Sequence, residues 1–285
     1  MQLITQLEVF TPRVTNSPLP VTDGTEETDP IQIKKIDGLG PVNATVNTDQ
    51  YGSVDGEFYN GSNTGKRNIV LTLLLNPDWS SQTIEQLRQV LYRYFMPKNE
   101  VTLRFTSTHM AQVEITGYVE SCEPNLWDKD AEYQVSIICP DAAFVATQPS
   151  NIQGTTLAFG SNSFTSIDYE GTLPAGFVLR VAANTANPSA TGEVRLVNTN
   201  PDITILIVTG TTVDSTHSLE FGTSQGDKYI DEIPLPSGSS SSLLGKLADG
   251  SNWPTLDEGI NEFQVLAADP GQDWSMTYIA RYGGL

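Results

Sequence analysis

The chain has 285 residues, 38% of them apolar, and a formal net charge of −19 at pH 7. This length accommodates two domains of ordinary size, and the apolar content is enough to build a core in each. The charge is spread evenly, −9 for residues 1–145 and −10 for residues 146–285. Since proteins bind nucleic acid chiefly through cations, we expect no sequence-specific nucleic-acid binding, although solubility alone explains such a charge equally well.

The sequence predicts no membrane segment and no membrane partner. The longest nearly unbroken apolar run, residues 69–75, is far shorter than the roughly 20 residues that a membrane-spanning helix needs. The first eight residues, MQLITQLE, have neither the basic start nor the apolar centre of a secretory signal. We therefore expect no export by the usual route.

Short strands dominate the first half of the chain. Six segments combine β-branched and aromatic residues and are separated by Gly, Pro, Asn and Asp, namely residues 32–39, 43–48, 67–75, 100–106, 111–121 and 132–139. This pattern predicts a β-barrel or sheet domain.

Residues 60–75, NGSNTGKRNIVLTLLL, resemble a phosphate-binding loop because a Gly-Lys pair precedes an apolar run. The spacing excludes that function: three residues rather than four separate Gly61 from Gly65, and Arg67 stands where the motif needs a hydroxyl. The run also alternates with a period of two, which predicts a strand and not the helix that would hold phosphate. We therefore expect a turn that leads into a strand, and no nucleotide cofactor.

One segment of the first half has helical periodicity. Its apolar side chains are spaced by three and four residues, which predicts an amphipathic helix over about 81–96 that covers one face or end of the sheet; they are Ile84, Leu87, Leu91, Tyr94 and Phe95. Ser80 or Ser81 can cap its start, and Pro97 ends it.

Cys122 and Cys139 lie on either side of a predicted hairpin, so they could approach each other across its strands. Two cysteines do not make a disulfide scaffold in a chain of this size, and with two histidines they lack the spacing of a zinc site. We expect reduced, half-buried thiols and no metal.

The second half of the chain reads as an antiparallel β-sandwich. About eight short strands recur at intervals of roughly ten residues, with turn residues between them. A polar stretch after residue 146 marks the boundary, which gives domains at 1–147 and 148–285. Residues 236–251, PSGSSSSLLGKLADGS, interrupt the strands and predict an exposed loop.

No catalytic constellation stands out. His109 and His217 are the only imidazoles, and no G-x-S-x-G turn precedes a helix. Asp214, Ser215 and Ser218 lie near His217, but neighbours on a strand point to alternate faces, so this cluster predicts a solvent-facing strand start. We expect the protein not to be an enzyme.

The order of several short segments resembles the distal tail proteins (Dit) of long-tailed bacteriophages. These segments are GKRNIVLTLLLNP, the helix IEQLRQVLYRYF, the strand end SIICPDAAF, the turn GSNWPTLDEGINEFQVLAA and the end MTYIARYGGL. The resemblance spans nearly the whole chain, and its specificity comes from the order and spacing of these segments.

The resemblance implies a structural protein of the virion, made in the host cytoplasm and placed at the distal end of the tail. It implies a homo-hexameric ring, formed by the first domain, that joins the tail tube protein to the tail hub or tip proteins. It also implies a galectin-like second domain that can carry receptor-binding or side-fibre proteins. A ring whose lumen passes DNA should not bind phosphates, and an acidic subunit meets that requirement.

Within such a ring, residues 47–66 form a long excursion that would reach the neighbouring subunit. Lys66 and Arg67 are then candidates for pairing with a carboxylate across the subunit interface.

A rival interpretation is a carbohydrate-binding module or adhesin, in which the second domain holds a glycan. Trp253 and Trp274 are then the candidate rings for stacking on a sugar, although a tryptophan near a loop more often packs beneath it. A third interpretation, an enzyme that cuts the cell envelope, requires a pair of acids in a groove.

Overall fold

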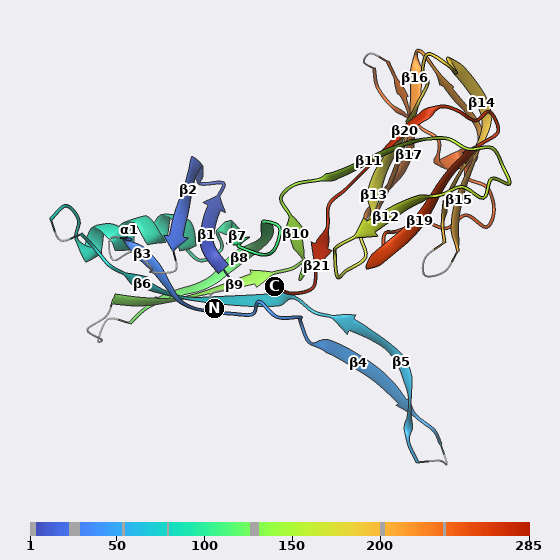
Figure 1. The fold of residues 1–285 in the computed structure, drawn as a ribbon. Helices are drawn as coiled ribbons and strands as arrows, with labels where there is room; N and C mark the ends of the chain where they lie inside the picture. Colours follow the sequence, from blue (N-terminus) through green and yellow to red (C-terminus); the bar gives the residue numbers. More distant parts are fainter. Residues whose placement is uncertain are drawn as a thin grey trace. The chain divides into compact units, whose positions relative to one another are not determined.

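The computed structural model describes residues 4–22, 29–52, 55–78, 80–125, 131–199, 203–235 and 238–285. The chain divides into two compact units (Figure 1). The first contains the chain up to Thr147 together with Tyr282–Leu285, and the second is Gln148–Arg281. Within the described residues, no helix is long and apolar enough to cross a membrane.

A barrel of seven strands forms the centre of the first unit. Its order is β8-β7-β1-β2-β3-β6-β9, and β9 pairs back onto β8 to close it. The strands are β1 (Ile4–Thr11), β2 (Val14–Thr22), β3 (Ile31–Asp37), β6 (Arg67–Leu75), β7 (Glu100–Ser107), β8 (Val113–Pro124) and β9 (Ala131–Cys139). The mainly β fold predicted for this half is confirmed.

Strand β6 shows why the sequence adopts this fold. Ile69, Leu71 and Leu73 are fully buried, whereas the residues between them face outward. The strand pairs with β3 on one side and with β9 along its whole length on the other. The period of two therefore places one face in the core, as the sequence predicts.

The helix α1 (Ile84–Phe95) packs on the barrel through Leu87, Leu91, Tyr94 and Phe95. It begins later than predicted, because Thr83 is the N-cap and forms a capping box with Gln86. Ser80 and Ser81, the expected caps, bind the carboxylate of Asp78 instead. The helix ends just before Pro97, as predicted.

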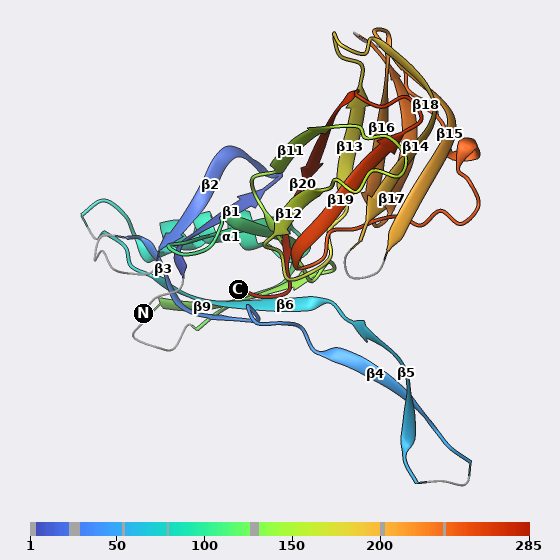
Figure 2. The same cartoon turned by 45° about the vertical axis from the view of Figure 1, so that its right-hand side comes forward.

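Two further strands, β4 (Ala44–Gln50) and β5 (Glu57–Thr64), pair only with each other. They leave the ends of β3 and β6 and run away from the barrel as a single ribbon, which both views show (Figures 1 and 2). We call residues 44–64 the arm.

The barrel sheet also receives two short strands, β10 (Phe144–Ala146) and β21 (Arg281–Tyr282). β10 follows the CPDAAF segment and pairs with the start of β8. β21 comes from the far end of the chain and pairs with β10. The last four residues, which the sequence analysis places with the second domain, thus belong to the first unit.

The second unit consists of two antiparallel sheets. One contains β11 (Ser150–Thr155), β20 (Asp273–Tyr278), β13 (Phe177–Ala182), β16 (His217–Ser224), β17 (Asp227–Pro234) and β18 (Ser241–Ser242). The other contains β12 (Thr165–Tyr169), β19 (Gly259–Ala267), β14 (Ser189–Asn198) and β15 (Thr204–Asp214). Phe177 of the first sheet meets Phe263 of the second edge to face at 5.2 Å, so the sheets pack as the predicted sandwich.

The serine-rich segment is only partly a loop. Ser241 and Ser242 form β18 at the edge of β17, and a short 3-10 helix, η1 (Leu244–Lys246), follows. The four consecutive serines, residues 239–242, are exposed, as predicted, but Leu243 is buried and anchors the segment. Pro236 and Ser237 lie outside the described residues.

Both cysteines are free thiols, and Cys122 is half-buried, as expected. Cys139 is fully buried instead, and the two do not approach each other. Cys122 is opposite Val135 in the register, whereas Cys139 lies against Gly117, five residues further along β8. At about 3.3 Å per residue, that offset is roughly 16 Å. Burial raises the pKa of each thiol to about 11.

The raised thiol pKa values predict a loss of stability at alkaline pH. An unfolded thiol ionises near pH 9, whereas the folded thiol stays neutral up to about pH 11. Because the unfolded state loses its proton first, the free energy of unfolding falls between about pH 9 and pH 11. The expected share of Cys139 is about 2 kcal/mol at pH 11. Urea unfolding at pH 8 to 11 should show a smaller decline for Cys139→Ala than for the parent; equal declines would contradict the assignment.

Candidate functional site

The arm exposes apolar side chains that an isolated protein would be expected to bury. Val46 is 58% exposed and Tyr59 64%, and their strand positions place them on one face. Tyr51, 54% exposed, and Phe58, 40% exposed, pair their rings at 5.2 Å. An apolar surface on a projecting ribbon is typical of a protein interface.

The arm is held together by few interactions of its own. Tyr59 and Ser62 share a hydrogen bond of 2.8 Å, Asn60 donates to Asp49 at 2.7 Å, and Thr48 donates to Glu57. A ribbon of two strands is at best marginally stable in water, so an arm of this kind gains order from a partner. All charged residues within the sequence of the arm are acidic, which favours a partner surface with donors or cations.

Arg67 lies at the root of the arm and is only 2% exposed. Its guanidinium donates hydrogen bonds to four main-chain carbonyls: Gly38 and Gly40 at 2.6 Å each, Gly283 at 2.6 Å and Ala142 at 2.8 Å. The guanidinium also lies over the ring of Phe144, 4.5 Å from its centroid. Arg67 thus joins four separate segments of the first unit.

The environment of Arg67 explains how a buried cation is tolerated. Desolvation lowers its pKa from the ordinary value, while the nearby thiol of Cys139 acts in the opposite direction. The planar fork of an arginine presents five donors, and here carbonyl oxygens replace the lost water. A lysine could not satisfy four acceptors in this arrangement.

The end of the chain packs on the same root. The amide of Leu285 donates to the carbonyl of Leu39 at 2.9 Å. Gly284 lies so close to the backbone of Pro41 that an added Cβ would come within 2.9 Å of it. Gly38 has a φ of +90°, and its Cβ position is 2.0 Å from the carbonyl oxygen of Asn68 on β6. Only glycine fits such contacts.

These observations separate the two residues that the sequence analysis pairs. Lys66 is exposed and remains a candidate for a subunit interface. Arg67 is not available for one, because its guanidinium is enclosed and bound to carbonyls of its own subunit. A cation at a strand start ordinarily predicts a surface position, and the nearby glycines of DGLG and YGGL are the only signal that a buried arginine lies among closely packed backbones.

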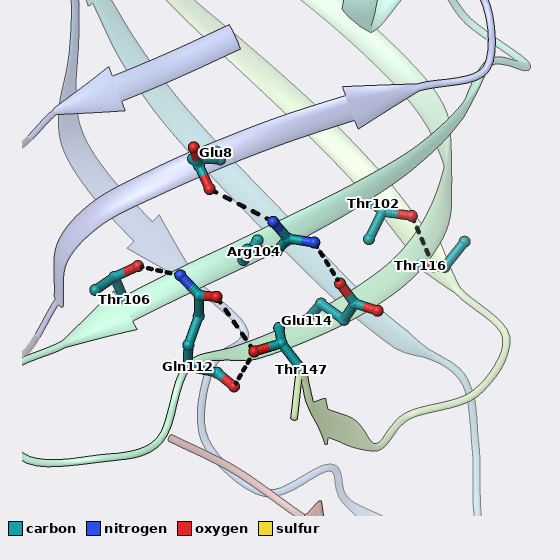
Figure 3. A network of polar contacts seen from close by, with 8 residues as sticks. All are labelled: Glu8, Thr102, Arg104, Thr106, Gln112, Glu114, Thr116 and Thr147. Atoms are coloured by element: carbon teal, nitrogen blue, oxygen red, sulfur yellow. Dashed lines mark hydrogen bonds and ion pairs between the residues drawn. The ribbon is translucent and has the colours of Figure 1, made fainter. Parts of the chain in front are cut away.

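The outer face of the barrel is polar and carries the network in Figure 3. Arg104 lies between two carboxylates, 3.8 Å from Glu8 and 3.4 Å from Glu114. Thr102 and Thr116 share a hydrogen bond of 2.9 Å beside them. Figure 3 shows these side chains projecting from β1, β7 and β8 on the same side.

Two cations of this outer face, Arg104 and Lys34, are paired with acids. Arg104 has two carboxylate neighbours and also lies over the ring of Phe10, 4.4 Å from its centroid. Lys34 pairs with Glu132. Glu120 accepts a hydrogen bond from Ser136 at 2.9 Å. Such a surface presents carboxylates and hydroxyls, and few of its cations are available to bind phosphate groups. It therefore has little affinity for DNA.

The two tryptophans of the glycan interpretation lie in different surroundings. Trp274 is 3% exposed and its ring packs against Gly154, so it offers no face to a sugar. Trp253 is half-buried, and the Lys228 ammonium lies 5.7 Å from its ring centroid. Neither arrangement is the open aromatic platform that sugar stacking needs.

The six-stranded sheet nevertheless bears a groove of 450 Å³ lined by both polar and apolar groups. Its lining comes from β11, β13 and β20 and consists of Gln153, Gly154, Thr155, Arg180, Ala182, Asp273, Trp274 and Ser275. Arg180 donates to Ser218 at 3.2 Å. The groove has polar groups that could bind hydroxyls.

Near His217 the structure contains a turn. Asp214 accepts hydrogen bonds from the amides of Thr216 and His217 at 2.7 and 2.8 Å, and the bonds from Thr216 lower its pKa to about 2. β16 begins at His217, as the sequence predicts. In the described part of the chain, no group of three His, Cys, Asp or Glu side chains could hold a metal ion.

Comparison with known proteins relates part of the chain to a protein family. Residues 22–159 match the model of the phage tail protein RIFT-related domain. This part of the chain is therefore similar to a phage tail domain. This phage tail domain includes β3 to β11 and therefore both the arm and Arg67. No curated protein matches the sequence.

Solved structures extend the likeness beyond the phage tail domain. The crystal structure of the SPP1 Dit protein (gp 19.1), described as a paradigm of the hub adsorption apparatus in phages that infect Gram-positive bacteria, has 13% identity and a TM-score of 0.63. That match covers 96% of this chain and 98% of the SPP1 chain. A chain of the phage P2 baseplate in its activated conformation with Ca has 10% identity and a TM-score of 0.47, over 98% and 99% of the two chains. The predicted Dit fold is confirmed.

Proposed function

We propose that this protein is a structural component of the hub at the distal end of a phage tail. Six copies form a closed ring that joins the tail tube protein to the tail hub or tip proteins. The observation that carries this proposal is the Dit fold over 96% of the chain, together with the phage tail domain in its first half. The second domain provides a surface for receptor-binding or side-fibre proteins.

In this ring the arm reaches the neighbouring copy. Its exposed apolar residues and its lack of cations support a docking role. The polar outer face of the barrel, with Arg104 held between Glu8 and Glu114, suits the wall of a channel that DNA passes. A ring of subunits with a charge of −19 each would repel phosphates along that channel.

The test is the state of the purified protein in solution. Sedimentation velocity over a range of concentrations and negative-stain images should give a six-fold particle with a central hole. A monomer at all concentrations would contradict the ring. The groove of the second unit then makes a carbohydrate-binding module the second candidate, and retention of glycans on an array would support it.

Charge reversal at Lys66 is expected to weaken ring assembly. If Lys66 pairs with a carboxylate of the adjacent copy, Lys66→Glu replaces an attraction by a repulsion and lowers the association constant about fivefold, more at low salt. Lys98→Glu, which reverses an exposed cation distant in sequence, is the control. Sedimentation at two salt concentrations measures the effect. Rings that form as readily as those of the parent would show that Lys66 is merely solvated.

A further inference from the structure

The arm is joined to the barrel by two short connections. The chain enters through Leu39 and Pro41, after β3, and leaves through Gly65 and Lys66, before β6. At seven residues per strand and about 3.3 Å per residue, the arm is roughly 25 Å long with its turn. A tilt of about 20° at the root would therefore move the tip by about 9 Å. A docking element of this length needs a fixed root.

Arg67 connects both sides of that root. Its backbone begins β6, directly after the exit through Gly65 and Lys66, and its side chain binds Gly38 and Gly40, shortly before the arm. The third carbonyl, that of Gly283, comes from the C-terminal segment. The fourth, that of Ala142, follows β9. The guanidinium therefore fixes the entry and exit of the arm to each other and to two further segments.

The C-terminal segment encloses the entry from another direction. Leu285 donates to Leu39, and Gly284 lies in contact with Pro41. Residues 282–285 are anchored independently through the pairing of β21 with β10. They therefore connect the entry of the arm to β10 and β8 of the barrel. The strands of the arm pair with neither of these strands.

We propose that Arg67 and residues 282–285 form a latch that fixes the direction in which the arm leaves the barrel, and that ring closure depends on this latch. The second half of this proposal rests on the proposed ring. Arg67 acts as a positioning residue, since it touches the root of the arm and not the docking surface.

Two variants of the full chain test the latch. Gly284→Ala places a methyl group against Pro41, and a chain ending at Tyr282 removes Gly283, Gly284 and Leu285 while keeping β21. Gly65→Ala is the matched control, because a Cβ there meets nothing within 4 Å. Spin labels on the exposed residues Gln50, at the far end of β4 in the arm, and Thr116 of the barrel report the direction of the arm.

We expect a narrow distribution of label distances in the parent and in Gly65→Ala, and a broad distribution in both latch variants. The melting temperature of the second unit should be the same in all of these proteins. If the competent direction is populated in a tenth of the molecules, the association constant of the ring falls about tenfold. Narrow distributions in both latch variants would overturn the proposal. Loss of rings in every protein, the parent included, would contradict the proposed function, while the distance distributions would still decide whether the latch fixes the arm.

Discussion

Replacing Arg67 with methionine is expected to lower the free energy of unfolding of the first unit by about 4 kcal/mol. Methionine fills much of the same space but donates no hydrogen bond. Four carbonyls, those of Gly38, Gly40, Ala142 and Gly283, lose the donor that now satisfies them. The stacking of the guanidinium on Phe144 is lost as well. Water can reach some of these oxygens only if the root of the arm opens.

Urea unfolding followed by hydrogen exchange measures this loss separately for the two units. The amides around residues 38–41 and 283–285 should lose protection first, whereas those of the second unit should not change. Arg93→Met is the control, because the same substitution there removes an exposed side chain of α1. A loss for Arg67→Met no larger than for Arg93→Met would show that the buried fork contributes little.

Removing the apolar surface of the arm is expected to abolish ring assembly without unfolding the subunit. The variant Val46→Ser with Tyr59→Ser changes two side chains that are 58% and 64% exposed. Because both are already in contact with water, folding loses little. If each buries its side chain at the interface, their joint loss of about 3 kcal/mol weakens association by roughly a hundredfold.

Sedimentation velocity and thermal melting together check this result. The control is Phe164→Ser with Ile203→Ser, which removes two exposed apolar side chains from the second unit. The control should form rings like the parent. Rings of normal stability in the arm variant would show that the arm does not carry the subunit contact, and a lowered melting temperature would show that these residues support the fold instead.

Local pattern predicted much of this structure. The alternation of Ile69, Leu71 and Leu73 gave strand β6, and the three- and four-residue spacing of Leu87 and Leu91 gave helix α1. Both depend on residues close in sequence, whose periodicity is set by backbone geometry. The start of the helix was predicted less well, because Ser80 and Ser81 bind Asp78 and leave the N-cap position to Thr83.

The root of the arm was beyond such reasoning. Arg67 at the beginning of a strand and next to Lys66 has the pattern of a surface cation, and its burial follows from segments that arrive from far along the chain. The return of Tyr282 to the first unit likewise has no local signal. Periodicity indicates which face of an element is buried, but not which distant backbone will supply the carbonyls for a cation.

The hydrogen bond between Arg67 and Gly283 spans 216 residues, which has a consequence for synthesis on the ribosome. The barrel strands emerge first, and at about 5–20 residues per second the second unit follows for several seconds before the C-terminal segment is available. Until then the root of the arm lacks one of its contacts. The first unit therefore completes the contacts of Arg67 only once residue 283 has been synthesised, long after its barrel strands.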